Sequence, residues 1–155
     1  MTGTDPAAGG PVPSNPGRAS VVVGVDGSDT ARAALETAAA MSASDGSAVV
    51  AVHAVGLVEV VAGDHVPSFG HRAEIADELR SWCAGLDDTP IEHRLEEGAP
   101  VDVLRRVADE IDASMIVIGR RGAGGRPDLL LGSTAHQLVE RSDRPVLVVP
   151  PSDRG

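Results

Sequence analysis

The sequence predicts a three-layer α/β fold, in which helices cover both faces of a doubly wound, five-stranded parallel sheet. Short apolar runs alternate with segments of helical periodicity along the chain, in the order β-α-β-α-β-α-β-α-β. Continuous apolar runs are typical of strands that are buried on both faces, as in parallel sheets. The length of 155 residues and the 42% share of hydrophobic residues suit one domain with its own core.

The first βα unit has the clearest boundaries. Residues 21–25 form the β-branched run VVVGV, which is closed by an Asp-Gly-Ser turn. Ser28 or Asp29 can cap the helix that we expect from residue 30 to about residue 42. Alanines on the inner face of this helix allow it to approach the sheet closely. A second apolar strand is expected at residues 48–55.

The middle of the chain is less regular. Residues 56–70 hold a proline, glycines and scattered valines, and we expect a loop there. Residues 71–86 have the apolar spacing of a helix. Residues 91–95 alternate between apolar and polar side chains, as an edge strand does. Pro100 suits the first turn of the helix that follows.

The C-terminal part contains two further strands. A buried strand is expected at residues 115–118 and is followed by a glycine-rich loop at residues 119–131. The segment Gly132-Ser133-Thr134 is expected to open a last helix, which carries Leu138 and Val139 and ends at about residue 141. The last strand, at residues 146–149, is apolar throughout.

The expected order of the strands in the sheet is 3-2-1-4-5. Strands 1 and 4 are apolar throughout, as central strands should be, and strand 3 alternates, as an edge strand should. Ligands of such sheets bind beyond the carboxyl ends of the strands, at the point where the strand order reverses. This order brings Asp26, at the end of strand 1, beside Gly119, at the end of strand 4.

The charge and the aromatic content exclude several classes of function. The net charge is −10 and aromatic residues make up 1% of the chain, which argues against a nucleic-acid partner. All 13 basic residues are arginines. The absence of lysine excludes a Walker loop, a Schiff-base enzyme and a phosphoreceiver domain.

We expect one domain at residues 19–151, between a flexible, Pro- and Gly-rich tail at residues 1–18 and a short end at residues 152–155. Cys83 is the single cysteine, so it forms no disulfide within the chain and no zinc framework. No apolar run is long enough for a membrane span, and no signal peptide is visible. These features predict a cytoplasmic protein that has no membrane partner.

The segment GRRGAGGRPDLLLGST, at residues 119–134, has the features of a phosphate-binding site. Its glycines let backbone N–H groups approach an anion, and the N-terminus of the following helix offers free amides. The hydroxyl groups of Ser133 and Thr134 can donate to phosphate oxygens, and Arg120, Arg121 and Arg126 supply positive charge. A flexible loop that precedes a capped helix is the alternative.

The spacing of the glycines in this segment also matches the motif of a known family. Gly119, Gly122, Gly132 and Ser133 fit the pattern Gly-x2-Gly-x9-Gly-Ser. Together with the opening VVVGVDGS and the ending RPVLVV, this pattern resembles the ATP-binding class of the universal stress protein (UspA-like) family. The resemblance implies a single domain of the adenine nucleotide alpha hydrolase-like fold. It also implies a homodimer, and the apolar edge strand at residues 146–149 is where we expect the two copies to pair.

The resemblance also implies which residues bind the nucleotide. Three residues at the end of strand 1 should lie near the adenosine, one at the end of strand 2 should line the adenine, and the others should follow the ribose and the phosphates. The expected site consists of Gly24, Val25, Asp26, Ala54, Gly119, Arg120, Arg121, Gly122, Ala123, Gly124, Gly132, Ser133 and Thr134. A turn role for Asp26, a packing role for Ala54 and solvated side chains for Arg120 and Arg121 remain open.

We therefore expect a regulatory or stress-response module that binds ATP, with or without Mg, and that is not a dedicated enzyme. AMP or cyclic AMP remains open as the ligand, and so does slow ATP hydrolysis. An adenylating enzyme of the related superfamily would need a second glycine in the Asp26-Gly27-Ser28-Asp29 turn. The acids and histidines at residues 59–71 match no metal-ligand spacing. The isolated histidines receive no chemical role; these are His53, His93 and His136.

Overall fold

The computed structural model describes residues 19–122 and 130–152. The strands are β1 (Ser20–Gly24), β2 (Ala48–Val55), β3 (Val58–Val61), β4 (Asp64–Pro67), β5 (Ile91–Glu97), β6 (Met115–Gly119) and β7 (Val146–Val149). The helices are α1 (Asp29–Asp45), α2 (Arg72–Trp82), α3 (Pro100–Glu110) and α4 (Ser133–Arg141). The expected tail at residues 1–18 and the last residues of the expected C-terminal end, 153–155, lie outside the described residues.

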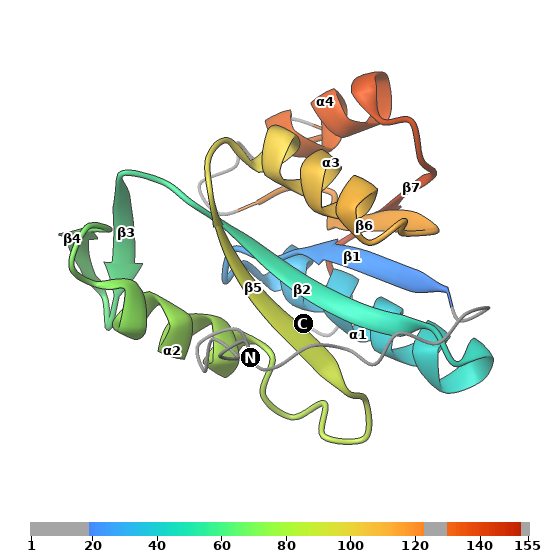
Figure 1. Ribbon diagram of the computed structural model, residues 1–155, viewed down its shortest axis with the longest axis horizontal. Coiled ribbons are helices and arrows are strands. Elements are labelled where there is room, and N and C mark those ends of the chain that lie inside the picture. The colour runs from blue at the N-terminus through green and yellow to red at the C-terminus, as the bar shows by residue number, and fades with distance from the viewer. Residues whose placement is uncertain (1–18, 123–129, 153–155) are drawn as a thin grey trace, which may run out of the picture.

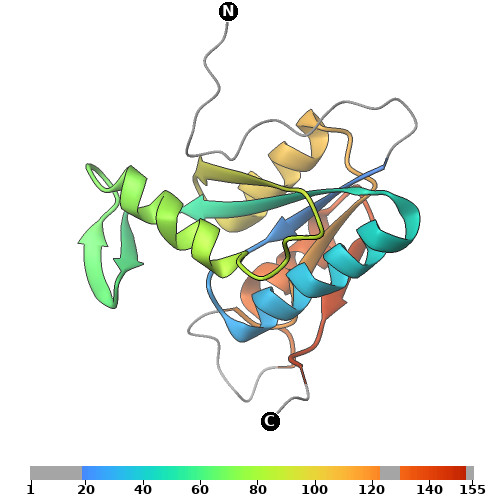
Figure 2. The same ribbon diagram turned by 90° about the horizontal axis from the view of Figure 1, so that it is seen from below.

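The main sheet confirms the predicted fold class. Its five strands are all parallel and lie in the order β5-β2-β1-β6-β7, which is the predicted order 3-2-1-4-5. Helices α1 and α2 cover one face of the sheet and α3 and α4 cover the other, as Figures 1 and 2 show. The edges of the sheet are β5, which is mostly half-buried, and β7.

Side chains of β1 fill both layers of the core. Val21 and Val23 pack in the layer under α1 and α2, whereas Val22 packs in the layer under α3 and α4. This alternation follows from the two-residue period of a strand. Because both layers are apolar, the central strands carry no polar face, and this is the reason for their continuous apolar runs.

Helix α1 begins and ends at strong signals. The Oγ atom of Ser28 accepts a hydrogen bond from the backbone N–H of Ala31 at 3.2 Å, so Ser28 rather than Asp29 is the N-cap. At the other end Gly46 has a φ of 77°, and its N–H donates to the carbonyl of Ser42 at 2.8 Å. The helix is therefore longer than the predicted 30–42.

The prediction of a loop at residues 56–70 was wrong. Strands β3 and β4 form an antiparallel hairpin there, which stands away from the main sheet in Figure 2. Ala62 and Gly63 make a two-residue turn with φ values of 52° and 89°. Two consecutive residues with positive φ match the twist of a hairpin. Each strand has only four residues, so the alternation is too short to stand out among scattered valines. Similarly, α2 ends at Trp82 rather than at residue 86.

Two further observations concern the cysteine and the length of the helices. Cys83, just after α2, is buried in the core, and this burial raises the pKa of its thiol to about 11. No helix in the described ranges has the length and apolar character that a membrane crossing requires.

Leu35 of α1 provides a test of the core. The exposed fraction of Leu35 is 0% and that of Leu57, before the hairpin, is 90%. We expect Leu35→Ala to lower the free energy of unfolding by about 2–5 kcal/mol, because it removes buried contacts and leaves a cavity. Leu57→Ala should change it by less than about 0.5 kcal/mol. Urea unfolding followed by circular dichroism measures both, and equal effects would contradict this packing.

Candidate functional site

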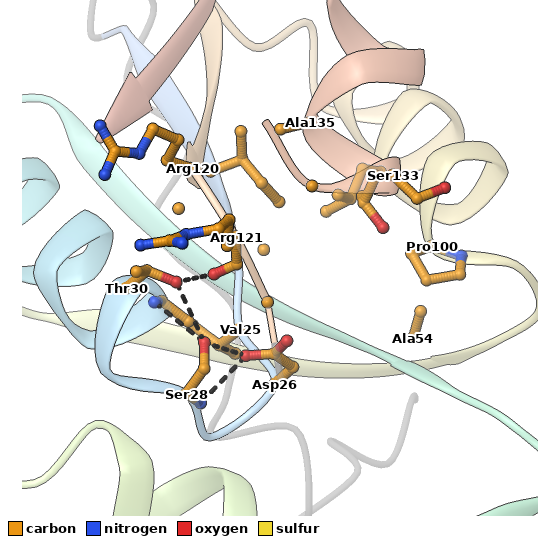
Figure 3. A pocket seen from close by; sticks show the side chains of 18 of the residues that line it. Val25, Asp26, Ser28, Thr30, Ala54, Pro100, Arg120, Arg121, Ser133 and Ala135 are labelled. Atoms are coloured by element: carbon orange, nitrogen blue, oxygen red, sulfur yellow. Dashed lines mark hydrogen bonds between the residues drawn. The ribbon is translucent and has the colours of Figure 1, made fainter. Parts of the chain in front are cut away.

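A cavity of about 360 Å³ opens at the carboxyl ends of β1, β2 and β6. It lies at the point where the strand order reverses, because β1 continues toward β2 on one side while β6 lies on the other. The N-terminus of α4 and the first residues of α1 and α3 complete its rim (Figure 3). The sequence predicted a site at this edge of the sheet.

The structure brings most of the predicted site residues together in this cavity. The predicted residues that line it are Gly24, Val25, Asp26, Ala54, Gly119, Arg120, Arg121, Gly122, Gly132, Ser133 and Thr134. Ala123 and Gly124 lie outside the described residues, as does Arg126. The lining residues that were not predicted are Ser28, Thr30, Ala31, Val52, His53, Pro100, Leu104, Ile118 and Ala135.

Asp26 shapes the turn between β1 and α1. Its Oδ1 atom accepts hydrogen bonds from the backbone N–H of Ser28 at 3.0 Å and from the Ser28 hydroxyl at 2.6 Å. Ser28 in turn caps α1, so one carboxylate oxygen fixes the start of the helix. The other oxygen, Oδ2, lies 2.6 Å from the position that a Cβ on Gly122 would take. The carboxylate therefore sits between the turn and the glycine-rich segment.

The glycines of the motif serve close packing within the protein. A Cβ on Gly119 would lie 2.7 Å from the backbone carbonyl carbon of Thr30, so α1 could not approach β6 as it does. The Thr30 hydroxyl also donates a hydrogen bond to the carbonyl of Arg121. The N–H of Gly132 donates to the carbonyl of Arg120 at 2.7 Å, which closes the base of the glycine-rich segment.

The N-terminus of α4 forms the polar side of the cavity. Gly132 is the N-cap and offers no side chain to the first turn. The N–H groups at the start of a helix have no acceptor within the helix, and the helix dipole adds partial positive charge there. Ser133 and Thr134 lie at this end, and Figure 3 shows the Ser133 side chain at the cavity. This arrangement suits an anion such as a phosphate.

The side chains of the two arginines of the motif, Arg120 and Arg121, extend away from the N-terminus of α4. In Figure 3 the side chains of Arg120 and Arg121 run toward the Thr30 side, away from Ser133 and Ala54. The Nε atom of Arg120 is buried and has no hydrogen-bond partner among the described residues. The backbone of both residues lines the cavity, but this orientation does not direct their guanidinium groups at the N-terminus of α4.

An apolar wall faces the polar side. It is made of residues from β2, α3 and β6 and of the residue that follows β1, namely Val25, Val52, Ala54, Pro100, Leu104 and Ile118. A Cβ on Gly24 would lie 2.8 Å from Cδ1 of Ile118 and 3.0 Å from Cδ1 of Leu104. Gly24 thus lets these side chains pack over the end of β1. A wall of this kind suits a flat, weakly polar ring.

Sequence reasoning missed His53, which also lines the cavity. Its Nδ1 atom lies 2.9 Å from the carbonyl oxygen of Val25, and its Nε2 atom lies 2.5 Å from Oε1 of Glu59. A histidine inside an otherwise apolar strand must find polar partners, and this was the available signal. Neither here nor in the rest of the described ranges are three His, Cys, Asp or Glu residues grouped so that they could hold a metal ion.

Comparison with known proteins identifies the family. A family model of the universal stress protein family matches residues 18–150. The chain belongs to this family. It is 31% identical to a Thermus aquaticus protein, "Universal stress protein in QAH/OAS sulfhydrylase 3'region", over 83% of this chain and 96% of that protein. It spans about half the length of other relatives, such as 46% of a universal stress protein from Mycolicibacterium smegmatis that is 30% identical over 86% of this chain.

Two solved relatives are complexes with nucleotides. A universal stress protein in complex with cAMP is 31% identical, has a TM-score of 0.67 and is matched over 87% of this chain and 98% of that chain. A universal stress protein from Archaeoglobus fulgidus in complex with dAMP is 26% identical and has a TM-score of 0.62, over 85% of this chain and 97% of that chain.

The packing around Gly119 can be tested by adding one methyl group. We expect Gly119→Ala to lower the free energy of unfolding by about 1–3 kcal/mol, because its Cβ would overlap the backbone of α1. Gly56→Ala is the matched control, since a Cβ there meets Oε2 of Glu59 at an ordinary 3.6 Å. Thermal and urea unfolding measure the difference. A Gly119→Ala variant as stable as the wild type would contradict the close packing.

Proposed function

We propose that this protein is a regulatory module of the stress response that binds ATP in the cavity between β1 and β6. The observation that carries the proposal is the pairing, across one cavity, of an apolar wall with the N-terminus of α4, which no side chain of the described residues caps. An adenine ring needs the first and a phosphate chain needs the second. The cAMP and dAMP that are bound to relatives support an adenine nucleotide as the ligand.

In this proposal each side of the cavity has its own role. The adenine lies against the wall that contains Ala54, and Asp26 accepts a hydrogen bond from the ribose or the base. The phosphates lie at Gly132, Ser133 and Thr134, where backbone N–H groups and hydroxyls donate to them. A Mg ion that accompanies ATP would be held through the phosphates, because the described cavity offers only one carboxylate, that of Asp26.

Binding rather than catalysis is the proposed activity. Among the described lining residues, Asp26 and His53 are the only groups able to act as a general base. Both nitrogens of His53 have partners, and one oxygen of Asp26 is held by Ser28. AMP or cyclic AMP is the second candidate ligand, because both relatives named above hold monophosphates.

We further propose that the protein is a cytoplasmic homodimer whose domain spans residues 19–151. Strand β7 is an apolar edge of the sheet, and Leu147 on it is partly exposed. An open edge strand can pair with a second copy about a two-fold axis.

Nucleotide binding is tested by thermal unfolding with ATP, AMP and cyclic AMP in parallel. A ligand at about 100 times its Kd adds about 2.7 kcal/mol to the free energy of unfolding. For a domain of this size, that corresponds to a rise in Tm of several degrees. We expect ATP to give the largest rise. No rise with any of the three at millimolar concentration would refute the proposal, and a larger rise with AMP or cyclic AMP would favour the second candidate.

Gly122→Ala separates binding from folding. Its Cβ would displace Oδ2 of Asp26, whereas Oδ1 can keep its hydrogen bonds to Ser28, so the free energy of unfolding should fall less than in Gly119→Ala. We expect the Kd for ATP to rise about tenfold or more, because Oδ2 leaves its position beside the cavity. Calorimetric titration measures the Kd. An unchanged Kd in the folded variant would exclude Asp26 and Gly122 from the binding site.

The dimer is tested through Leu147. The Leu147→Glu substitution would place two like charges near the two-fold axis, and we expect it to shift the protein toward the monomer. Val148 is a poorer choice, because it packs against the core under α3 and α4. Leu57→Glu is the control with the same charge change far from β7 in the sequence. Sedimentation at micromolar concentration measures the oligomeric state of each variant, and a monomeric wild type would refute the proposal.

A further inference from the structure

His53 lies where three parts of the molecule meet. It belongs to β2, has an exposed fraction of 7% and lines the cavity. Its two ring nitrogens contact the carbonyl of Val25, just after β1, and the carboxylate of Glu59 on β3. Its ring meets Trp82 at the end of α2 edge to face, with centroids 5.0 Å apart and an interplanar angle of 82°.

Both ring nitrogens of His53 have hydrogen-bond partners. The carbonyl of Val25 can only accept, so Nδ1 carries a hydrogen atom. The contact at Nε2 needs one proton, which lies between the imidazole nitrogen and Oε1 of Glu59. Each ring nitrogen of His53 is therefore hydrogen-bonded, one to β1's continuation at Val25 and one to the hairpin at Glu59.

Glu59 also holds the hairpin in place. Its Oε2 atom accepts a hydrogen bond from the N–H of Gly56 at 2.8 Å, and its side chain is 12% exposed. Val58 and Val60 on the same strand point outward and are exposed. A two-stranded hairpin is marginally stable by itself, so its position depends on contacts with the rest of the domain. The Glu59–His53 bond is one of these, and the bond from the N–H of Ala62 to Glu78 is another.

His53 also connects Glu59 to the residues that line the cavity. Val25 donates its N–H to the carbonyl of Val52 at 2.9 Å and accepts from His53 through its own carbonyl. It is thus fixed to β2 beyond the last residue of β1, directly before Asp26. Glu59 does not line the cavity and touches this arrangement only through His53.

We infer that Glu59 and His53 are positioning residues that couple the β3–β4 hairpin to the nucleotide site. A docked hairpin holds His53, His53 holds Val25, and Val25 sets the place of the adjoining Asp26. By thermodynamic reciprocity, a nucleotide that favours this arrangement must also favour the docked hairpin. This inference rests on the proposed binding of an adenine nucleotide.

Two substitutions of Glu59 in the full chain test the coupling. Glu59→Ala removes the link, and we expect the Kd for ATP to rise about fivefold or more, within the usual range of coupling between sites. Glu59→Gln should keep the Kd near that of the wild type. Its amide can donate to Nε2 of a neutral His53 and still accept from Gly56. Glu74→Ala, which removes an exposed carboxylate from α2, is the control.

Amide hydrogen exchange in β3 distinguishes coupling from a purely local role of Glu59, because a local role would not make exchange in β3 depend on ATP. In the wild type, ATP should slow amide exchange in β3 as well as at the cavity. In Glu59→Ala this effect on β3 should vanish. An unchanged Kd in Glu59→Ala, or exchange in β3 that ignores ATP in the wild type, would overturn the inference. The wild-type measurement decides if Glu59→Ala does not fold.

A measurement without nucleotide separates this inference from the proposed function. In the free protein, Glu59→Ala should speed amide exchange at Val25, because His53 no longer holds its carbonyl. If no adenine nucleotide binds the wild type, the proposed function fails, and this experiment still tests the link between the hairpin and β1. Unchanged exchange at Val25 would refute the link whether or not a nucleotide binds.

Discussion

The parallel pairing of β1 with β6 at the centre of the sheet is the constraint on which the rest of the structure depends. Beyond this pair the chain leaves β1 for α1 on one face and leaves β6 for the segment that leads to α4 on the other. The two connections diverge, so a space opens between them at the carboxyl ends of the strands. That divergence places the turn after β1 and the N-terminus of α4 on opposite sides of this space.

Small residues let the walls of this space come together. Gly24 admits side chains of β6 and α3 over the end of β1, and Gly119 admits the backbone of α1. The glycines of the motif are therefore needed for close contacts within the protein as well as for the approach of a ligand. Their first effect is on the shape of the cavity. Its chemistry comes from backbone N–H groups and from the few side chains that the shape leaves exposed.

The sequence allowed the sheet, its strand order and the position of the cavity to be predicted, because each depends on local patterns. Apolar runs mark central strands, and Ser28 and Gly46 mark the ends of α1 through capping. The hairpin escaped prediction because two strands of four residues carry little periodicity. The role of His53 depends on Glu59, which reaches it only once the hairpin has folded back. The direction of the Arg120 side chain is likewise set by the path of the backbone.

The burial of Cys83 has a consequence for the response of the chain to oxidants. A thiol with a pKa of about 11 is almost entirely protonated at neutral pH, and only the thiolate reacts readily. Because the chain holds no other cysteine, the folded domain is a poor target for peroxide or disulfide exchange at sulfhydryl groups. The same thiol becomes reactive when the core opens. Its rate of alkylation therefore reports the unfolded fraction, without any added label.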